Sequence, residues 1–239
     1  MWNMRKSIIY KSFSNYRLTH IAEKFRKLSN SDNLLILNDK NLRELAFFNE
    51  IGVTYNHIRK SANTNIFKIL LDIFKKDHPQ AYDLDENLSP EKFRGYKLLK
   101  LSNNFNDGFI NKILESYKFT FVRNPYTRSL SMFRDKILNK EISILPNFFN
   151  YEDSLEGFKQ FLTHLKENYQ DSNMHFHSQT EHLFFTVKNY DFVGKVENFK
   201  KDFIFMLKDS KILKSEICSY NFNFNNNFKH LTNSEHLTN

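Results

Sequence analysis

The chain has 239 residues, a formal net charge of +8 and a single cysteine. This length suits one domain with a large buried core, and one cysteine excludes both an intramolecular disulfide and a cysteine-rich zinc site. The positive charge favours an anionic ligand, and because the basic residues are spread along the chain we expect no nucleic-acid partner.

The amino-terminal part shows helical periodicity at residues 18–28 and 42–48, with a short apolar run at residues 34–37 between them. Residues 1–18 contain no apolar stretch long enough for a signal peptide or a membrane anchor, so we expect no transmembrane segment. Together with the single cysteine, this predicts a cytoplasmic protein in a reducing compartment. We assign no chemistry to the chain before residue 50.

A strand is expected at residues 53–58, followed by the polar loop KSANTN and by an amphipathic helix over residues 66–74. A loop that joins a strand to a helix N-terminus can hold a phosphate group with its backbone amides. This loop is not a Walker A loop, because the pattern G-x-x-x-x-G-K-[ST] is absent. The candidate phosphate ligands are Lys60, Ser61, Ala62, Asn63, Thr64 and Asn65.

The middle of the chain is expected to contain a loop region at residues 75–95, a short strand at residues 96–101 and a helix at residues 109–117. The stretch KFTFVRNPYTRSLSMF follows. It indicates a buried strand at residues 119–122, because aromatic and β-branched side chains suit a covered strand.

Arg123 stands at the carboxyl end of that strand, where a second helix N-terminus is expected. Asn124 is a good N-cap, and Pro125 suits the first helical position. Arg123, the free amides of the helix and the hydroxyl of Ser131 could all face a bound anion. The side chains that recur on one side of this helix are Tyr126, Leu130 and Phe133.

The last third of the chain alternates between irregular and helical patterns. Residues 142–151 are irregular, and Asp153 with Glu156 indicates a capping box at the start of a helix. A strand leading into a further helix is expected from residue 191, and residues 221–239 are expected to form a loop-like tail. The first helix should bury Leu155, Phe158, Leu162 and Leu165, and the second carries Phe199, Phe203 and Met206.

Residues 173–180, NMHFHSQT, contain a candidate general base, His175, because an imidazole titrates close to neutral pH. The alternative is a hydrogen-bonded structural histidine, and the base would then be His57, Glu50 or His177. No carboxylate or cysteine at a recognised ligand spacing accompanies these histidines, so we expect no metal.

The stretch FVRNPYTRSLSMF resembles the 3′-phosphate-binding motif of family 2 carbohydrate sulfotransferases, which use 3′-phosphoadenosine 5′-phosphosulfate (PAPS). That motif is roughly hydrophobic-V-R-(D/N)-P-(Y/F)-x-R-x-x-S-x-(Y/F). Its fixed positions are matched by Arg123, Asn124, Pro125, Tyr126, Arg128, Ser131 and Phe133.

The earlier stretch HIRKSANTNI resembles the 5′-phosphosulfate loop of the same family, roughly P-K-x-(A/G)-x-(S/T)-(S/T). Lys60, Ala62 and Thr64 match this pattern. The departures from it are Arg59, Asn63 and Asn65.

Two later segments extend the resemblance. NMHFHSQT is similar to the family's H-(W/F)-x-P-Q segment, in which His175 and Gln179 match and Ser178 replaces the proline. DFVGKVENF is similar to the D-(F/L)-(I/V)-G-(K/R)-x-E segment. All of these segments occur in the order found in the family.

The resemblance implies a fold and an activity. The fold is a single α/β domain over residues 1–239, with its cofactor-binding core at about residues 50–210. A mostly parallel sheet lies between helices in three layers, as in P-loop nucleotide-binding proteins, and such sheets bind ligands at their strand ends. The activity is transfer of a sulfuryl group from PAPS to a hydroxyl of a carbohydrate, which can be anionic or lipid-linked, with peripheral membrane contact allowed.

The resemblance also implies residue roles. Lys60 would stabilise charge on the bridging oxygen of PAPS, Arg123 and Ser131 would hold the 3′-phosphate, and no metal would be needed. Animal Golgi relatives usually carry a membrane anchor, so its absence points to a cytoplasmic, bacterial enzyme. Two alternatives stay open, a kinase that uses ATP on the same scaffold and a noncatalytic basic module that binds nucleic acid or acidic glycan.

Overall fold

The computed structural model describes residues 17–29, 39–77, 89–100, 104–139, 151–169 and 174–212. The predicted apolar run at residues 34–37, the irregular segment at residues 142–150 and the tail at residues 221–239 lie outside these ranges.

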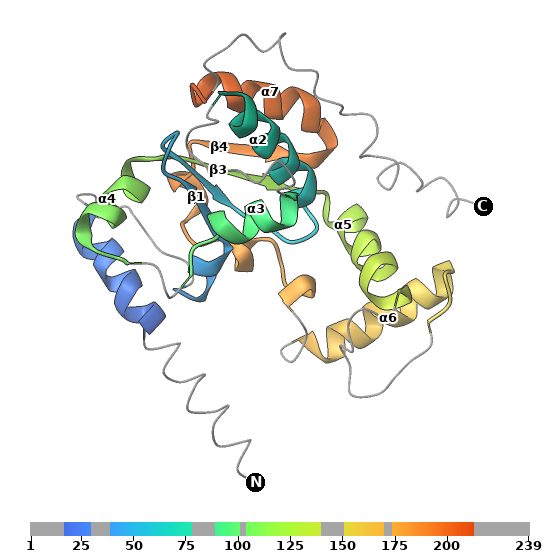
Figure 1. Cartoon of the computed structure of the whole chain (residues 1–239). Coiled ribbons are helices and arrows are strands. Elements are labelled where there is room, and N and C mark those ends of the chain that lie inside the picture. The colour runs from blue at the N-terminus through green and yellow to red at the C-terminus, as the bar shows by residue number, and fades with distance from the viewer. Residues whose placement is uncertain are drawn as a thin grey trace.

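A four-stranded sheet in the order β1-β2-β3-β4 occupies the centre of the fold (Figure 1). β1 pairs antiparallel with β2, whereas β2, β3 and β4 run parallel to one another. The strands are β1 (Leu45–Phe48), β2 (Val53–Asn56), β3 (Tyr117–Val122) and β4 (Phe192–Lys195). The sheet is therefore mostly parallel, and helices flank it, which confirms the predicted α/β class.

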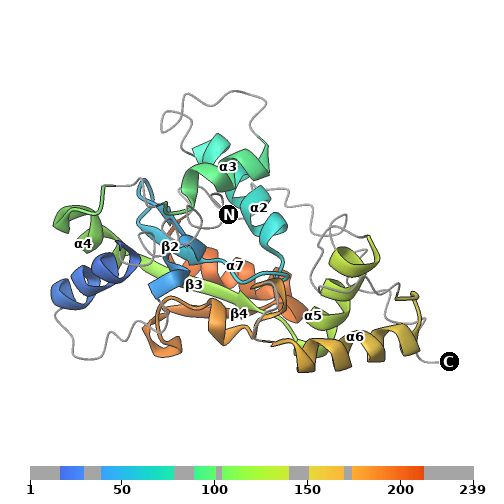
Figure 2. The same ribbon diagram turned by 90° about the horizontal axis from the view of Figure 1, so that it is seen from below.

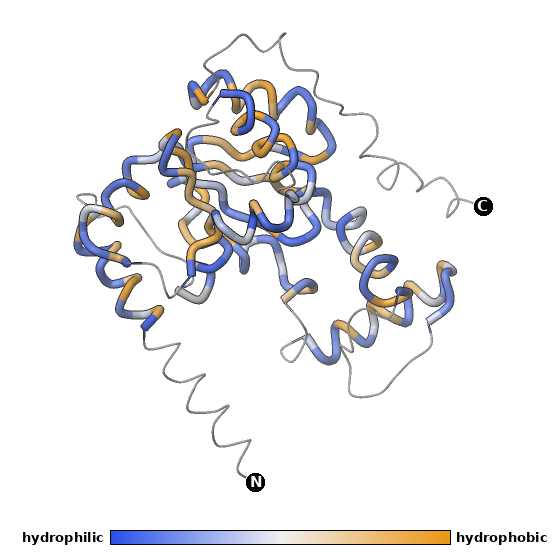
Figure 3. Tube along the Cα trace, viewed as in Figure 1, coloured by the Kyte–Doolittle hydropathy of each residue, from blue (hydrophilic) through white to orange (hydrophobic). Residues whose placement is uncertain are grey.

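Apolar side chains cover both faces of the sheet. On one face, Phe48, Tyr55 and Phe119 pack against α2 (Asn63–Asp77), α3 (Pro90–Lys97) and α7 (Phe199–Asp209). On the other face, Leu45 and Phe47 pack against the helix at residues 17–28 and α4 (Asp107–Glu115). Figure 2 shows the helices around the sheet from a second side, and Figure 3 shows the hydrophobic segments gathered at the strands and at the parts of the helices nearest to them.

The strand register brings the loops after β2, β3 and β4 to one edge of the sheet. Asn56 pairs with Thr120, and Val122 pairs with Lys195, so β2, β3 and β4 all end on the same side of the sheet. The loops that follow these strands meet at that edge, where open parallel sheets bind ligands. Gly194 is required in β4, because a Cβ there would lie 2.4 Å from Cε1 of Phe121.

A smaller apolar cluster lies beside the sheet. α5 (Pro125–Met132) continues without a break into the π-helical turn η3 (Phe133–Leu138), and both pack near α6 (Leu155–Glu167). The side chains that form the cluster are Met132, Phe133, Phe161 and Phe176. This packing fixes the helix that follows β3 and so the position of its first turn.

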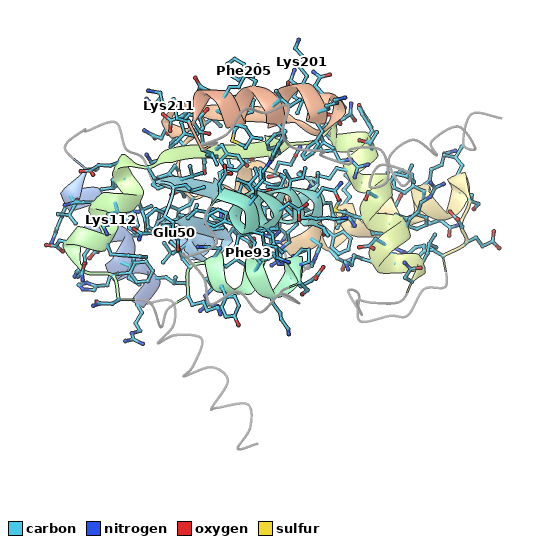
Figure 4. The ribbon with its side chains drawn as sticks, turned by 45° about the horizontal axis from the view of Figure 1, so that its top comes forward. Glu50, Phe93, Lys112, Lys201, Phe205 and Lys211 are labelled. Atoms are coloured by element: carbon cyan, nitrogen blue, oxygen red, sulfur yellow. The ribbon has the colours of Figure 1, made fainter. Side chains whose placement is uncertain are left out.

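Several local predictions are confirmed. The Asn124 side chain caps α5 by accepting hydrogen bonds from the amides of Tyr126 and Thr127, and Pro125 is the first helical residue. The predicted helices at residues 66–74 and 109–117 correspond to α2 and α4. α7 buries Phe199, Phe203 and Met206 as expected. Figure 4 shows Lys201 and Phe205 pointing outward from the same helix.

Three element predictions are wrong. Residues 42–48 do not form the expected helix: a short 3-10 helix, η1 (Asp39–Glu44), ends within them, and β1 follows, because its pairing with β2 overrides the local helical pattern. The expected loop at residues 75–95 contains the end of α2 and the start of α3, which Ser89 caps with its side-chain oxygen. The expected strand at residues 96–101 is reduced to one bridge between Ala46 and Leu98.

Burial along two helices does not follow the periodic side chains. In α5, Tyr126 is 84% exposed, and Arg128 is buried because its guanidinium has polar partners inside. In α6, the prediction that Leu155 and Leu162 are buried is wrong, because both are exposed and Phe161 is buried instead. The N-cap of α6 is Ser154, whose Oγ accepts from the amide of Gly157, and not Asp153.

Candidate functional site

The loop after β2 has a strained backbone. Lys60 and Ala62 have φ values of 65° and 60°, a left-handed conformation that non-glycine residues rarely adopt. Hydrogen bonds hold this shape, since the Ser61 amide and the Asn63 side chain both donate to the carbonyl of Ile58, at 3.2 and 2.6 Å. Strain of this kind, about 1–3 kcal/mol per residue, persists where surrounding contacts fix it and often marks a functional loop.

α2 begins directly after this loop, at Asn63. The first amides of a helix have no intrahelical acceptor and carry partial positive charge, so the start of α2 offers donors to an anion. The Asn63 side chain is buried and bonded to Tyr55 and Ile58, and Ser61 is fully buried, so both side chains hold the loop. Thr64 is exposed and Asn65 is half-buried at the same helix start.

The two predicted phosphate-binding segments touch each other. Arg123, which follows β3, is buried, and its Nη1 donates to the carbonyl of Lys60 at 3.4 Å. Its Nε donates to Oγ1 of Thr127 at 3.2 Å, and burial lowers the pKa of its guanidinium. Ser131 is half-buried on α5. Because Asn124 already accepts from the first amides of α5, an anion at this end depends on Arg123 and Ser131.

Gln179 joins the two segments, although the sequence assigned it no role. Its Oε1 accepts from the amide of Arg123 at 2.8 Å and from Oγ of Ser61 at 3.4 Å. Its Nε2 donates to the carbonyl of Arg123 at 2.7 Å. One side-chain amide therefore fixes the end of β3 relative to the loop after β2. The only sequence signal was its match to a family segment.

A buried carboxylate anchors the loop from behind. Oε2 of Glu44 lies 2.6 Å from Nδ1 of His57, and its Oε1 accepts from Nη2 of Arg59 at 3.1 Å. Burial by itself would raise the pKa of Glu44, but the hydrogen bond and charge of His57 and the charge of Arg59 hold it at about 2. Glu44 is therefore ionised and balances a cation of the loop.

Arg128 supports the same loop from α5. Its Nε donates to the carbonyl of Arg59 at 2.9 Å, and its Nη2 lies 3.4 Å from both the carbonyl of His175 and Nε2 of His182. Burial lowers the pKa of Arg128 to about 10, which leaves it charged at neutral pH. Sequence reasoning missed this role, although Arg128 is a fixed position of the family motif.

His175 lies at the edge of this network. Its Nε2 is 3.2 Å from Nη1 of Arg59, which must donate to it, so Nε2 is an acceptor. Burial, followed by the charges of Arg59, Lys136 and Lys60, lowers the pKa of His175 to about 4. The imidazole ring is therefore neutral at neutral pH, and the lone pair on its Nε2 already accepts a hydrogen bond from Arg59.

Of the alternative bases, Glu50 lies away from this edge of the sheet. His57 is buried against Glu44, and Glu50 pairs with Lys97 at 2.8 Å in the turn between β1 and β2. That turn precedes β2, so it lies at the opposite edge of the sheet from the loop; Figure 4 labels Glu50. His177 lies 3.8 Å from Glu181. The position of Glu50 therefore excludes it as a general base at this loop.

Lys60 is paired with an acid that the sequence did not single out. Its Nζ donates to Oδ2 of Asp135, on η3, at 2.7 Å, and the side chains are 18% and 38% exposed. Nζ of Lys136 lies 3.1 Å from the same oxygen. Burial lowers the pKa of Lys60, and the bond to Asp135 opposes that effect. The site thus contains cations from two segments around one carboxylate.

The described ranges contain no cluster of three or more His, Cys, Asp or Glu side chains that could hold a metal ion. Among the same residues, no helix is long and apolar enough to cross a membrane.

The chain was compared with protein families, curated proteins and solved structures. The family model described as "Sulfotransferase family" matches residues 43–238, a span that includes all the site residues named in this section. Neither the curated proteins nor the solved structures include a match to this chain.

Proposed function

Since this chain belongs to the sulfotransferase family, and is therefore a transferase, we propose that it moves a sulfuryl group from PAPS to a carbohydrate hydroxyl. The observation that carries the proposal is the direct contact between the two segments that are predicted to bind anions. Arg123 donates to the carbonyl of Lys60, and Gln179 bonds to both segments. A donor with phosphate groups at both its 3′ and 5′ positions needs two such segments at a fixed separation.

The donor would be held by residues from both loops. Arg123 and Ser131 would bind the 3′-phosphate, the group that distinguishes PAPS from ATP. Lys60 and the amides at the start of α2 would bind the 5′-phosphosulfate, with side chains or backbone from Ser61, Ala62, Asn63, Thr64 and Asn65 completing the loop. Partly buried cations stabilise an anion more strongly than exposed ones, because water screens them less.

Sulfuryl transfer requires that the reacting groups are held in the right positions and that the negative charge developing on the leaving group is neutralised. The acceptor oxygen forms a bond to sulfur while the bond from sulfur to the bridging oxygen breaks, and the electron pair goes to the leaving adenosine 3′,5′-bisphosphate. Lys60 would stabilise the charge that develops on that bridging oxygen. These groups can neutralise the leaving group without a metal ion.

The acceptor hydroxyl must also lose a proton. His175 was predicted to accept it, and this stays a prediction. If it is right, the acidic limb of the turnover profile falls near the pKa of His175, which is about 4, and the variant His175→Gln lacks that limb. If the histidine is structural, the variant keeps both its turnover and its acidic limb.

Nucleotide titration tests the choice of donor. Adenosine 3′,5′-bisphosphate should bind at least ~10-fold and up to ~100-fold more tightly than 5′-AMP, because charge-assisted contacts to the 3′-phosphate are worth about 1.5–3 kcal/mol. Equal affinity for the two nucleotides would contradict the proposal. ATP and a DNA oligonucleotide belong in the same titration, since preferential binding of either would favour the kinase or the basic binding module.

The acceptor is proposed as a carbohydrate, and the net charge of +8 would suit an anionic or lipid-linked glycan. A screen of neutral and acidic glycans with radiolabelled PAPS tests this part. Transfer to an amine or to a small phenol in preference to every glycan would contradict it.

A further inference from the structure

The proton of the acceptor hydroxyl needs a recipient close to Lys60. In the reaction proposed above, Lys60 contacts the bridging oxygen, and the attacking hydroxyl lies on the far side of the sulfur atom, about 3 Å from it. A base within reach of that hydroxyl therefore lies only a few ångströms from the ammonium group of Lys60. Asp135 meets this condition, since its Oδ2 is 2.7 Å from Nζ of Lys60.

Asp135 is also accessible. Its side chain is 38% exposed, whereas that of Lys60 is 18% exposed, so the carboxylate is more open to solvent than the ammonium group. It belongs to η3, the π-helical turn that prolongs the helix of the predicted 3′-phosphate motif. Turns of this rare kind are frequent at functional sites. A sugar hydroxyl that approached from solvent could therefore reach Asp135.

We infer that Asp135 accepts the proton of the acceptor hydroxyl, and that donor binding prepares it for this role by drawing Lys60 away from it. This inference rests on the proposed sulfotransferase function. It adds a catalytic residue on the acceptor side that is distinct from the predicted donor ligands.

Moving Lys60 away from Asp135 would make the carboxylate a stronger base for electrostatic reasons. Burial acts to raise the pKa of Asp135, but hydrogen bonds to Lys60 and Lys136 lower it, so without donor the carboxylate is ionised and a weak base. When Lys60 turns to the phosphosulfate, Asp135 loses one of these hydrogen bonds and gains a negatively charged neighbour. Both changes raise its pKa, and a carboxylate of higher pKa is a stronger base.

The proposed step balances. As the hydroxyl oxygen bonds to sulfur, its O–H bond breaks and the proton passes to a carboxylate oxygen of Asp135. The bond from sulfur to the bridging oxygen breaks, and its electron pair leaves with adenosine 3′,5′-bisphosphate next to Lys60. Asp135 then releases the proton to solvent.

The structure favours Asp135 over His175 for this role. Nε2 of His175 accepts from Arg59, an arginine that Glu44 also holds in place. Burial, followed by the cations of the loop and of η3, keeps the pKa of His175 low. His175 therefore has one lone pair engaged, whereas donor binding removes a hydrogen bond from Asp135.

The test compares Asp135→Asn with His175→Gln. Water can serve as the acceptor, so release of radiolabelled sulfate from PAPS measures turnover without knowledge of the glycan. We expect Asp135→Asn to slow release by ~10²–10⁴-fold and to lose the acidic limb of the pH profile, with affinity for adenosine 3′,5′-bisphosphate changed less than about threefold. His175→Gln should keep the limb.

Two further variants sharpen the result. Asp153→Asn removes an exposed carboxylate that lies 3.6 Å from Nε of Arg134, and it should match the wild type throughout. Asp135→Ala should recover turnover when formate is added, because the small carboxylate can occupy the vacated space. Recovery is not expected of a residue that only supports the fold.

The outcomes separate this inference from the proposed function. If wild-type protein fails to bind adenosine 3′,5′-bisphosphate, the proposed function fails. If it binds and Asp135→Asn retains wild-type release, the inference alone fails. The inference is likewise overturned if Asp135→Ala is slow, unaffected by formate and still shows the acidic limb, or if the limb disappears only in His175→Gln.

Discussion

The buried carboxylate behind the loop gives a quantitative test of the structure. Replacing Glu44 by Gln keeps the size of the side chain and removes a charge that His57 and Arg59 contact. The pKa of Glu44 is about 2, compared with an ordinary value of 4.5. Since a tenfold change in proton affinity is worth ~1.4 kcal/mol, this depression corresponds to about 3 kcal/mol of folding free energy.

The sign of the pH dependence follows from the direction of this shift. A carboxyl whose pKa is depressed on folding contributes its full stability above its unfolded pKa and loses it as the pH falls towards the folded pKa. Glu44→Gln should therefore be less stable than the wild type by about 3 kcal/mol at pH 7. The difference should shrink between about pH 5 and pH 2, because the wild-type carboxylate becomes protonated there.

Urea unfolding followed by circular dichroism at a series of pH values measures this difference. Glu115→Gln is the matched control, because Glu115 is exposed on α4 and its replacement should change stability by less than about 0.5 kcal/mol at any pH. A deficit for Glu44→Gln that stays constant from pH 7 to pH 3, or no deficit at all, would refute the reasoning. Comparison at fixed pH also removes the contribution of other titrating groups.

Other variants test the donor site and the sheet. Lys60→Ala should lower turnover by at least ~100-fold, measured as sulfate release, because it removes charge placed for the transition state. Arg123→Ala should instead weaken adenosine 3′,5′-bisphosphate binding ~10-fold or more in a direct titration. Gln179→Ala should weaken the same binding. Gln179→Glu should weaken it as well, because a carboxylate cannot donate a hydrogen bond to the Arg123 carbonyl. Gly194→Ala should lower the melting temperature, because its methyl group would collide with Phe121; an unchanged melting temperature would show that the strand adjusts.

The sequence by itself determined the local parts of the site. Its patterns predict the strand that ends at Arg123, the Asn124 cap, Pro125 at the first helical position and the loop that precedes α2. Each depends on residues within a few positions of one another, such as side chains that suit a covered strand or a cap that satisfies nearby amides. Motif order then supplied the family, which the family model confirms.

Only the tertiary structure decided which distant side chains meet. Asp135 contacts Lys60 across 75 positions, and Gln179 contacts Arg123 across 56, and no periodicity in the sequence encodes such pairings. The burial of Arg128 could not be predicted from the sequence for the same reason. A charged residue is expected at the surface unless the fold supplies buried hydrogen-bond partners, as the carbonyl of Arg59 does here. Sequence patterns report the preferences of neighbouring residues, whereas packing of the sheet and helices sets which charges compensate one another.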